Sequence, residues 1–198
     1  MYTQEVAATT AARLATFEDL RALEDPDRVE IIDGALVQKA MPSVAHSRSQ
    51  TQLIVELGDF NRRHGRRPGG WWLFAEIHVE YRSHQICCHD IAGWRRDRVS
   101  EMPSGWPVKI RPDWVCEIVS PSHEKRDMVD KPSVLHTAEV PHFWLVNPEE
   151  KMLFVQRWSP AGYTTILSAS SGQTVRAEPF EAIELRVGVL FGEPEDDD

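Results

Sequence analysis

Short runs in which apolar and polar residues alternate predict strands over most of the chain. Two apolar runs, 28–32 and 35–39, flank Asp33-Gly34. They predict a hairpin, because Asp-Gly favours the tight turns that join antiparallel strands. Residues 71–81 alternate and residues 85–91 are largely apolar, so each range predicts a strand. Further short strands are expected at 143–147, 152–157, 163–167 and 183–187.

The helical signals are fewer. Thr16 as N-cap with Asp19 in the capping-box position predicts a short helix over 16–23. Apolar residues at helical spacing predict a long helix over 42–64. A third helix is expected to end near Glu139. Because strands and helices do not alternate regularly, the fold class is α/β with an α+β-like arrangement.

Three acids lie in apolar runs that predict buried strands. Glu117 lies in the middle of the run 114–119, which prolines bound on both sides, and Glu30 and Asp90 lie in earlier strands. Burying an ionised carboxylate costs several kcal/mol unless a cation, a metal or hydrogen bonds compensate it. These three acids are therefore the first candidates for a functional site.

Asp90 and Glu117 are 27 positions apart (117 − 90), which leaves room for one loop between adjacent strands. Two carboxylates on neighbouring strands suit a hard divalent cation such as Mg²⁺. Such an ion polarises a phosphoryl oxygen and lowers the pKa of a bound water. The downstream cations Lys125, Arg126 and Lys131 would neutralise charge developing on a phosphate. On pattern alone, a single buried acid is more often a salt-bridge partner or an outward-facing strand residue.

Composition limits the remaining options. The 198 residues fit one domain, expected over 1–192 and followed by a disordered acidic tail, 193–198. The sequence has no apolar stretch long enough for a membrane span and no signal-peptide pattern. Three cysteines make a poor disulfide framework, so a cytoplasmic location is expected. The net charge of −9 argues against a broad surface that coats nucleic acid.

Several motifs occur together and in a fixed order: 28–34, 42–46, 90–96, 111–122, 126–131, 140–148 and 175–185. In these residues the chain resembles the bacterial putative restriction endonuclease family, also called domain of unknown function 820, over about 16–190. That family belongs to the PD-(D/E)XK nuclease superfamily. The resemblance implies a restriction-endonuclease-like core, with a mixed central β-sheet flanked by helices. It also implies metal-dependent phosphodiester hydrolysis of nucleic acid, with DNA preferred over RNA as the substrate. A homodimer is a further expectation from the resemblance.

The resemblance also assigns site residues. Asp90 matches the first acid of the superfamily, and Glu117 matches the acid of the second half-motif. Glu30 resembles the acid of the N-terminal region, and His46 resembles the histidine that opens the following helix. The implied site holds one or two Mg²⁺ or Mn²⁺ ions on Asp90, Glu117 and the backbone carbonyl of Ile118. Glu30 would complete the shell directly or through water, and His46 would contact phosphate or water.

One position departs from the superfamily pattern. Val119 stands where a lysine is usual, and the family supplies this lysine from the next helix, at Lys131. Lys131 would orient the attacking water or stabilise the phosphorane. Because proline fits only the first turn of a helix, Pro132 requires that helix to begin near Lys131 or to kink there. The valine and the acidic net charge support an alternative function, a catalytically inactive nuclease-fold module that binds nucleic acid or protein.

Other residue groups favour ordinary structural roles. Strand alternation places Cys87 and His89 on one face and Cys88 on the other, which disfavours a zinc site with His84. The thiols are expected to be small core residues. The arginine clusters at 62–67 and 95–98 could bind phosphate, although charge runs usually form solvated faces. The tryptophans of the strands are expected to pack in the core: Trp94, Trp114 and Trp144.

Overall fold

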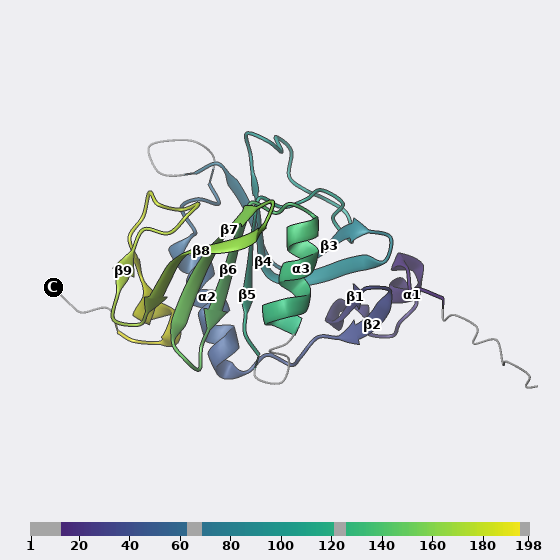
Figure 1. Ribbon diagram of the computed structural model, residues 1–198, viewed down its shortest axis with the longest axis horizontal. Helices are drawn as coiled ribbons and strands as arrows, with labels where there is room; N and C mark the ends of the chain where they lie inside the picture. The colour runs from purple at the N-terminus through teal and green to yellow at the C-terminus, as the bar shows by residue number, and fades with distance from the viewer. Residues whose placement is uncertain (1–12, 63–68, 121–125, 195–198) are drawn as a thin grey trace, which may run out of the picture.

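The computed structural model describes residues 13–62, 69–120 and 126–194 (Figure 1). In chain order its elements are α1 (Phe17–Arg21), η1 (Pro26–Arg28), β1 (Val29–Ile32), β2 (Ala35–Gln38), α2 (Val44–Glu56), β3 (Trp71–Arg82), β4 (Gln85–Arg95), β5 (Trp114–Ile118), η3 (Arg126–Asp130), α3 (Lys131–Thr137), β6 (His142–Asn147), β7 (Met152–Ser159), β8 (Gly162–Ser170), β9 (Thr174–Val175), β10 (Leu185–Arg186) and η4 (Val187–Phe191). Among the described residues, no helix is long and apolar enough to cross a membrane.

The centre of the fold is a mixed sheet. Its strands run in the order β2-β1-β4-β5-β6-β7-β8, with β3 paired to β4, and a separate small sheet joins β9 and β10. Within the large sheet β5 and β6 pair in parallel, and the other recorded pairs are antiparallel. The expected mixed central sheet is therefore confirmed.

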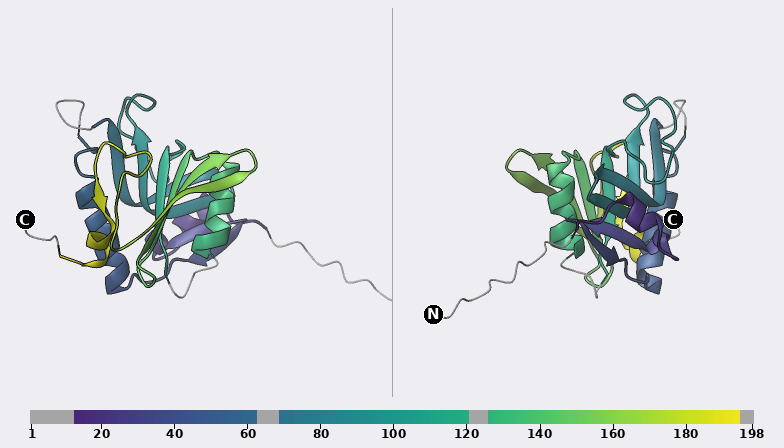
Figure 2. Two further views of the ribbon diagram at one scale, coloured as in Figure 1. Left: turned by 60° about the vertical axis from the view of Figure 1, so that its left-hand side comes forward. Right: turned by 90° about the vertical axis from the view of Figure 1, so that its right-hand side faces the viewer.

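Helices α2 and α3 cover opposite faces of this sheet (Figure 2). Leu53 of α2 packs with Trp114 and Trp144 in the larger core cluster, whereas Leu135 of α3 packs with Val115 in the second cluster. Trp114 and Val115 are neighbours in β5, so this short strand contributes to both cores, as the alternation of side chains along a strand requires. The predicted core positions of the tryptophans are confirmed, because each is at most 1% exposed.

Most predicted elements are present close to their expected bounds. The Asp33-Gly34 turn has φ values of 50° and 76°, and β1 and β2 pair on either side of it. Helix α1 has the predicted capping box, in which the Thr16 backbone N–H donates to the Asp19 carboxylate at 2.7 Å. The predicted strand over 71–81 is confirmed, but its strict alternation is wrong, because Glu76 has a φ of 48° and His78 is buried.

The long helix is shorter than predicted. Ser43 caps α2 near the expected start, accepting the His46 backbone N–H at 3.1 Å, but the helix ends at Glu56 and not at 64. Leu57 is its C-cap and Gly58 comes next, and glycine destabilises a helix interior by about 1 kcal/mol relative to alanine. Residues 57–61 form turns, in which Asn61 bonds the backbone N–H of Leu73 at 3.1 Å.

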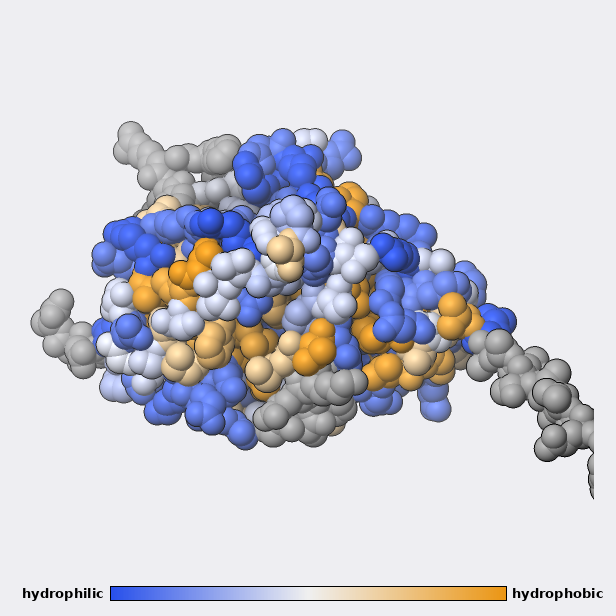
Figure 3. Space-filling model, in the orientation of Figure 1, coloured by the Kyte–Doolittle hydropathy of each residue, from blue (hydrophilic) through white to orange (hydrophobic). Residues whose placement is uncertain are grey.

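At the C-terminal end the fold extends slightly past the predicted boundary at 192. The Glu193 backbone N–H donates to the Gly188 carbonyl at 3.1 Å, and the Glu193 carboxylate lies 3.1 Å from Lys151. Residues 195–198, the rest of the predicted tail, lie outside the described residues. On the face in Figure 3, hydrophobic residues lie in small groups between hydrophilic ones.

One edge of β4 is paired in two separate places. Ile86 pairs with Ile31 of β1, and Ile91 pairs with Cys116 of β5. Between them, within the described part of the chain, no strand pairing occurs on this edge. Because buried backbone groups require hydrogen-bond partners, side chains must satisfy the β4 backbone in this gap. The candidate site lies there.

Candidate active site

Two charged side chains complete the backbone hydrogen bonding of Cys88 in this gap. The Cys88 backbone N–H donates to Glu30 Oε1 at 2.8 Å, and the Cys88 carbonyl accepts from Lys131 Nζ at 3.1 Å. Lys131 Nζ also lies 3.0 Å from Glu30 Oε1. Glu30 and Lys131 are both fully buried. Glu30 therefore has a backbone N–H donor and a cation to compensate the burial of its charge.

Asp90 lies at the end of the gap and faces α2 and β2. Its Oδ2 accepts the Ile118 backbone N–H at 2.7 Å and lies 3.1 Å from His46 Nε2. Its Oδ1 lies 2.8 Å from Lys39 Nζ, although this ion pair lacks hydrogen-bond geometry. Burial alone would raise the pKa of Asp90, but Lys39 and the His46 hydrogen bond outweigh burial and hold the pKa below its ordinary value.

Three residues around Asp90 were missed by the sequence reasoning: Lys39, Glu76 and Gln50. Lys39 Nζ lies 2.7 Å from Glu76 Oε2, and Gln50 Nε2 donates both to Glu76 Oε1 at 2.7 Å and to the Asp90 carbonyl at 2.9 Å. The left-handed backbone of Glu76 is rare for a non-glycine residue in a strand and marks local strain at the site. A lysine at the end of a hairpin gives no sequence signal of burial.

Glu117 is held from the opposite side. Its Oε2 lies 2.7 Å from Lys131 Nζ, and its Oε1 lies 2.5 Å from His89 Nδ1. The other ring nitrogen of His89, Nε2, lies 2.7 Å from the Tyr81 hydroxyl. Burial raises the pKa of Glu117 to about 7, Lys131 opposes this rise, and Asp90 adds to it. Burial also lowers the pKa of His89 well below its usual range, so His89 is a neutral imidazole.

The backbone around Pro132 brings the Lys131 ammonium to Glu117. Helix α3 begins at Lys131, directly after the π-helical turn η3, and Pro132 occupies its first turn, where no backbone N–H is needed. Val119, at the position where the resemblance predicted a lysine in other proteins, is 5% exposed and packs in the cluster that includes Leu135. The buried ammonium thus comes from the helix and not from the strand.

Asp90 and Glu117 line one small cavity of about 10 Å³. The other described residues that line it are Arg28, Lys39, Ala40, Pro42, His46, Glu76, Ile118, Ser120, Asp127 and Lys131. This volume is about the smallest that holds one water. His46 Nδ1 is buried and has no hydrogen-bond partner among the described residues, so it can accept a bond from such a water.

The donors at this cavity fit a hard cation in type. Carboxylate oxygens of Asp90 and Glu117 and a backbone carbonyl are ligands that Mg²⁺ accepts, with water completing its shell. The buried Asp90 Oδ1, which lacks a hydrogen bond, is a suitable donor. In the described residues, however, no three His, Cys, Asp or Glu side chains converge into a ready-made ligand set. Lysines engage both carboxylates instead, which is how the protein compensates their charge without a metal.

The remaining sequence candidates fall outside the cavity. All three cysteines are buried free thiols, as expected. Arg98 pairs with Asp113 at 2.7 Å, and the Arg96 guanidinium lies 3.3 Å over the Trp72 ring. Residues 63–67 of the first arginine cluster and Lys125 lie outside the described residues.

The family model Uma2, described as putative restriction endonuclease, matches residues 14–188. The chain belongs to this family. A crystal structure similar to this Uma2 chain is that of a putative nuclease belonging to DUF820 from Anabaena variabilis ATCC 29413. The two are 22% identical with a TM-score of 0.68, and the match covers 89% of this chain and 97% of that one. This likeness confirms the nuclease-like fold. Comparison with curated proteins gives no match.

Proposed function

We propose that this Uma2-family chain is an endonuclease that hydrolyses phosphodiester bonds with the help of Mg²⁺ or Mn²⁺. The observation that carries the proposal is the joint placement of Asp90 and Glu117 on one buried cavity, with the Lys131 ammonium 2.7 Å from Glu117. Membership of a restriction endonuclease family supports a nucleic-acid substrate, and we propose DNA as the preferred one.

The residues that would hold the cation are Asp90, Glu117 and the carbonyl of Ile118. When bound, the ion would polarise the scissile phosphate and lower the pKa of the attacking water. Glu30 would act through Lys131 or a water, since it lies 3.0 Å from the Lys131 ammonium and accepts the Cys88 backbone N–H.

The chain's own groups would supply positioning and charge. In hydrolysis a water oxygen bonds to phosphorus, the bond from phosphorus to the leaving oxygen breaks, and the water's proton passes to solvent or to the leaving oxygen. Lys131 would stabilise the added negative charge of the phosphorane, since a buried ammonium acts strongly in a low-dielectric site. His46 would orient a water or a phosphate oxygen through Nδ1, while its Nε2 stays on Asp90.

A cleavage assay tests this function directly. Supercoiled plasmid, linear duplex, single-stranded DNA and RNA are incubated with purified protein and Mg²⁺, Mn²⁺ or chelator. We expect cleavage that needs the metal, favours DNA, and disappears in Asp90→Ala and Glu117→Ala. Glu184→Ala, which removes an exposed surface acid paired with Arg176, is the matched control and should cleave like the wild type.

Equal cleavage by all four proteins would reveal a contaminating nuclease and would contradict the proposal. Nucleic-acid binding without any cleavage, unaltered by metal, would instead support the alternative of a catalytically inactive nuclease-fold module.

A further inference from the structure

We infer that Tyr81 and His89 are positioning residues, which form a hydrogen-bond chain that orients the buried Glu117 carboxylate for the reaction. This inference rests on the proposed function and extends it to two residues outside the cavity. Neither side chain is among the described residues that line the cavity around Asp90 and Glu117. They would therefore act through Glu117 and not on the substrate.

The direction of the chain follows from the donors available. His89 is fully buried and contacts Glu117 through Nδ1 and Tyr81 through Nε2. A neutral imidazole has one donor and one acceptor nitrogen, and an ionised carboxylate only accepts. With Glu117 ionised, the arrangement that satisfies all three groups is Tyr81 O–H to His89 Nε2, and His89 Nδ1–H to Glu117 Oε1. The tyrosine hydroxyl thereby fixes which nitrogen faces Glu117, as outer-shell partners of metal-binding residues commonly do.

Two contacts from different elements then set the orientation of Glu117. His89 of β4 holds Oε1 and Lys131 of α3 holds Oε2. With both oxygens held, rotation of the carboxylate is restricted relative to Asp90 across the cavity. Loss of the His89 contact would leave Lys131 as the side-chain partner of Glu117 among the described residues and would let the carboxylate turn towards α3.

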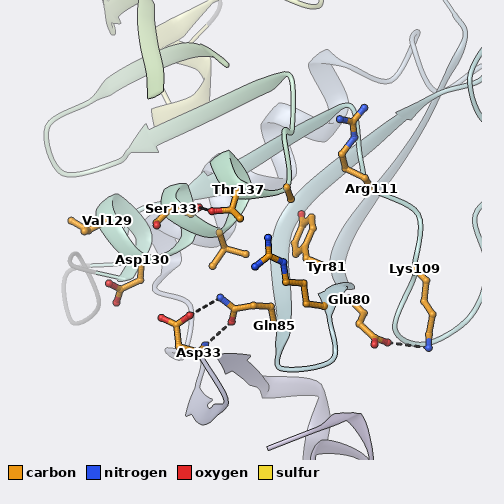
Figure 4. Close-up of a pocket in the computed structure, with 13 residues that line it drawn as sticks. Asp33, Glu80, Tyr81, Gln85, Lys109, Arg111, Val129, Asp130, Ser133 and Thr137 are labelled. Carbon is orange, nitrogen blue, oxygen red and sulfur yellow. Dashed lines mark hydrogen bonds and ion pairs between the residues drawn. The ribbon is translucent and has the colours of Figure 1, made fainter. Parts of the chain in front are cut away.

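Tyr81, the first residue of this hydrogen-bond chain, also borders a second pocket beside α3. It lines a separate pocket of about 450 Å³ between α3 and the β3–β4 hairpin, together with residues such as Arg82, Ser133 and Thr137 (Figure 4). The Tyr81 hydroxyl lies 2.7 Å from Nε2 of the fully buried His89. Half-buried Tyr81 thus borders this pocket with its ring, while its hydroxyl contacts the fully buried His89 that holds Glu117.

A double-mutant cycle tests the inference. Wild type, Tyr81→Phe, His89→Asn, the double variant and His89→Ala are compared for kcat and KM in DNA cleavage and for Mn²⁺ affinity by calorimetry. Tyr81→Phe removes only the hydroxyl, and His89→Asn keeps a donor near Nδ1 but loses Nε2. We expect Tyr81→Phe to lower kcat and Mn²⁺ affinity about tenfold, and His89→Ala up to about a hundredfold, the range seen for outer-shell partners of metal sites.

The diagnostic result is non-additivity. In the His89→Asn background Tyr81→Phe should have no further effect, because the nitrogen that the hydroxyl serves is already gone. KM for DNA should change little throughout, and His89→Asn should retain more activity than His89→Ala. Tyr163→Phe and His78→Asn are the matched controls, since each removes a buried or half-buried hydrogen bond to a backbone carbonyl away from Glu117.

The outcomes separate the two proposals. If the wild type cleaves and the Tyr81 and His89 variants lose no more than their controls, or if the effects simply add, the positioning inference is overturned and the nuclease function stands. If the wild type neither cleaves nor binds Mn²⁺, the proposed function fails and the inference fails with it.

Discussion

Asp90 and Glu117 line the same cavity but have opposite surroundings. Asp90 accepts a backbone N–H from Ile118 and contacts Lys39 and His46. Although burial would raise its pKa, the Lys39 ammonium and the His46 hydrogen bond outweigh burial and hold the pKa below the ordinary value. Burial raises the pKa of Glu117 to about 7, against the opposing effect of the Lys131 ammonium, which Glu117 shares with the buried acid Glu30. Environments that push the pKa values of two neighbouring carboxyl groups apart give the groups different roles.

This difference indicates a division of labour. Asp90 stays ionised throughout the physiological range and would be the constant anchor of a cation. Glu117 exchanges a proton near neutral pH, so a cation that binds it must displace that proton or outcompete Lys131. The charge on the Glu117 side of the cavity therefore changes with pH and with cation binding, whereas the charge on the Asp90 side does not.

The largest expected effect comes from removing the constant anchor. Asp90→Asn keeps the shape of the side chain but removes the charge, and we expect cleavage to fall by about 1000-fold, since a metal contributes several kcal/mol to the transition state. Asp97→Asn, an exposed acid paired with Arg95, is the matched control. A loss of less than tenfold in steady-state cleavage would show that Asp90 is not the anchor.

Replacing each of the two buried lysines tests the comparison of Asp90 with Glu117 through the free energy of unfolding. Lys131→Met should lower the free energy of unfolding by about 3–5 kcal/mol, because it leaves Glu30 and Glu117 buried without their shared cation. Lys39→Met should cost less, since Asp90 keeps its bonds to Ile118 and His46. Urea denaturation of both variants measures which of the two loses more stability. A larger loss for Lys39→Met would contradict the division of labour.

The raised pKa of Glu117 predicts a pH dependence. Between the ordinary value of 4.5 and about 7 the folded protein keeps a proton that the unfolded chain has lost, so this group's contribution to stability falls as pH rises. Relative to Glu117→Gln, the wild type in chelator should lose about 3 kcal/mol across this window, at about 1.4 kcal/mol per pH unit.

The Glu117→Gln reference cancels contributions shared by both proteins, including those of His78 and His142, whose pKa values burial lowers. Denaturation curves from pH 4 to 8 provide the measurement. Parallel stability profiles for the two proteins would show that Glu117 has an ordinary pKa.

The smallest expected effect concerns the support of Asp90. His46→Ala should reduce cleavage about tenfold, in line with other outer-shell partners, because Ile118 and Lys39 still hold Asp90. His84→Ala, which removes a bond to the Ala15 carbonyl far from the cavity, serves as control. A loss as large as that of Asp90→Asn would show that His46 is as important to the reaction as the anchor that it supports.

Much of the fold follows from local signals in the sequence. The Asp33-Gly34 turn, the Thr16 capping box and the apolar run around Glu117 each determine local structure with residues close in sequence, and all three predictions are confirmed. The predicted end of α2 was wrong, because the turn after Gly58 depends on a tertiary hydrogen bond between Asn61 and Leu73.

The site residues show the same contrast between signals that are local in the sequence and contacts that form only in the fold. Buried acids in apolar strands and the family resemblance led to Asp90, Glu117, Glu30, Lys131 and His46, which the structure gathers around one gap in the sheet. Lys39 and Glu76 were missed because their burial depends on contacts between β2, β3 and β4. His89 was predicted only to share a face with Cys87, and its bond to Glu117 crosses between strands that the sequence does not align in register.

The central claim is that Asp90 and Glu117 share one divalent cation. The most direct measurement is the anomalous difference density of crystals soaked in Mn²⁺ at about pH 8, where Glu117 is ionised. We predict one peak at about 2.0–2.2 Å from a carboxylate oxygen of each residue and from the Ile118 carbonyl, the distances usual for small hard cations. Density without a peak there, with Lys39 still on Asp90 and Lys131 still on Glu117, would contradict the claim.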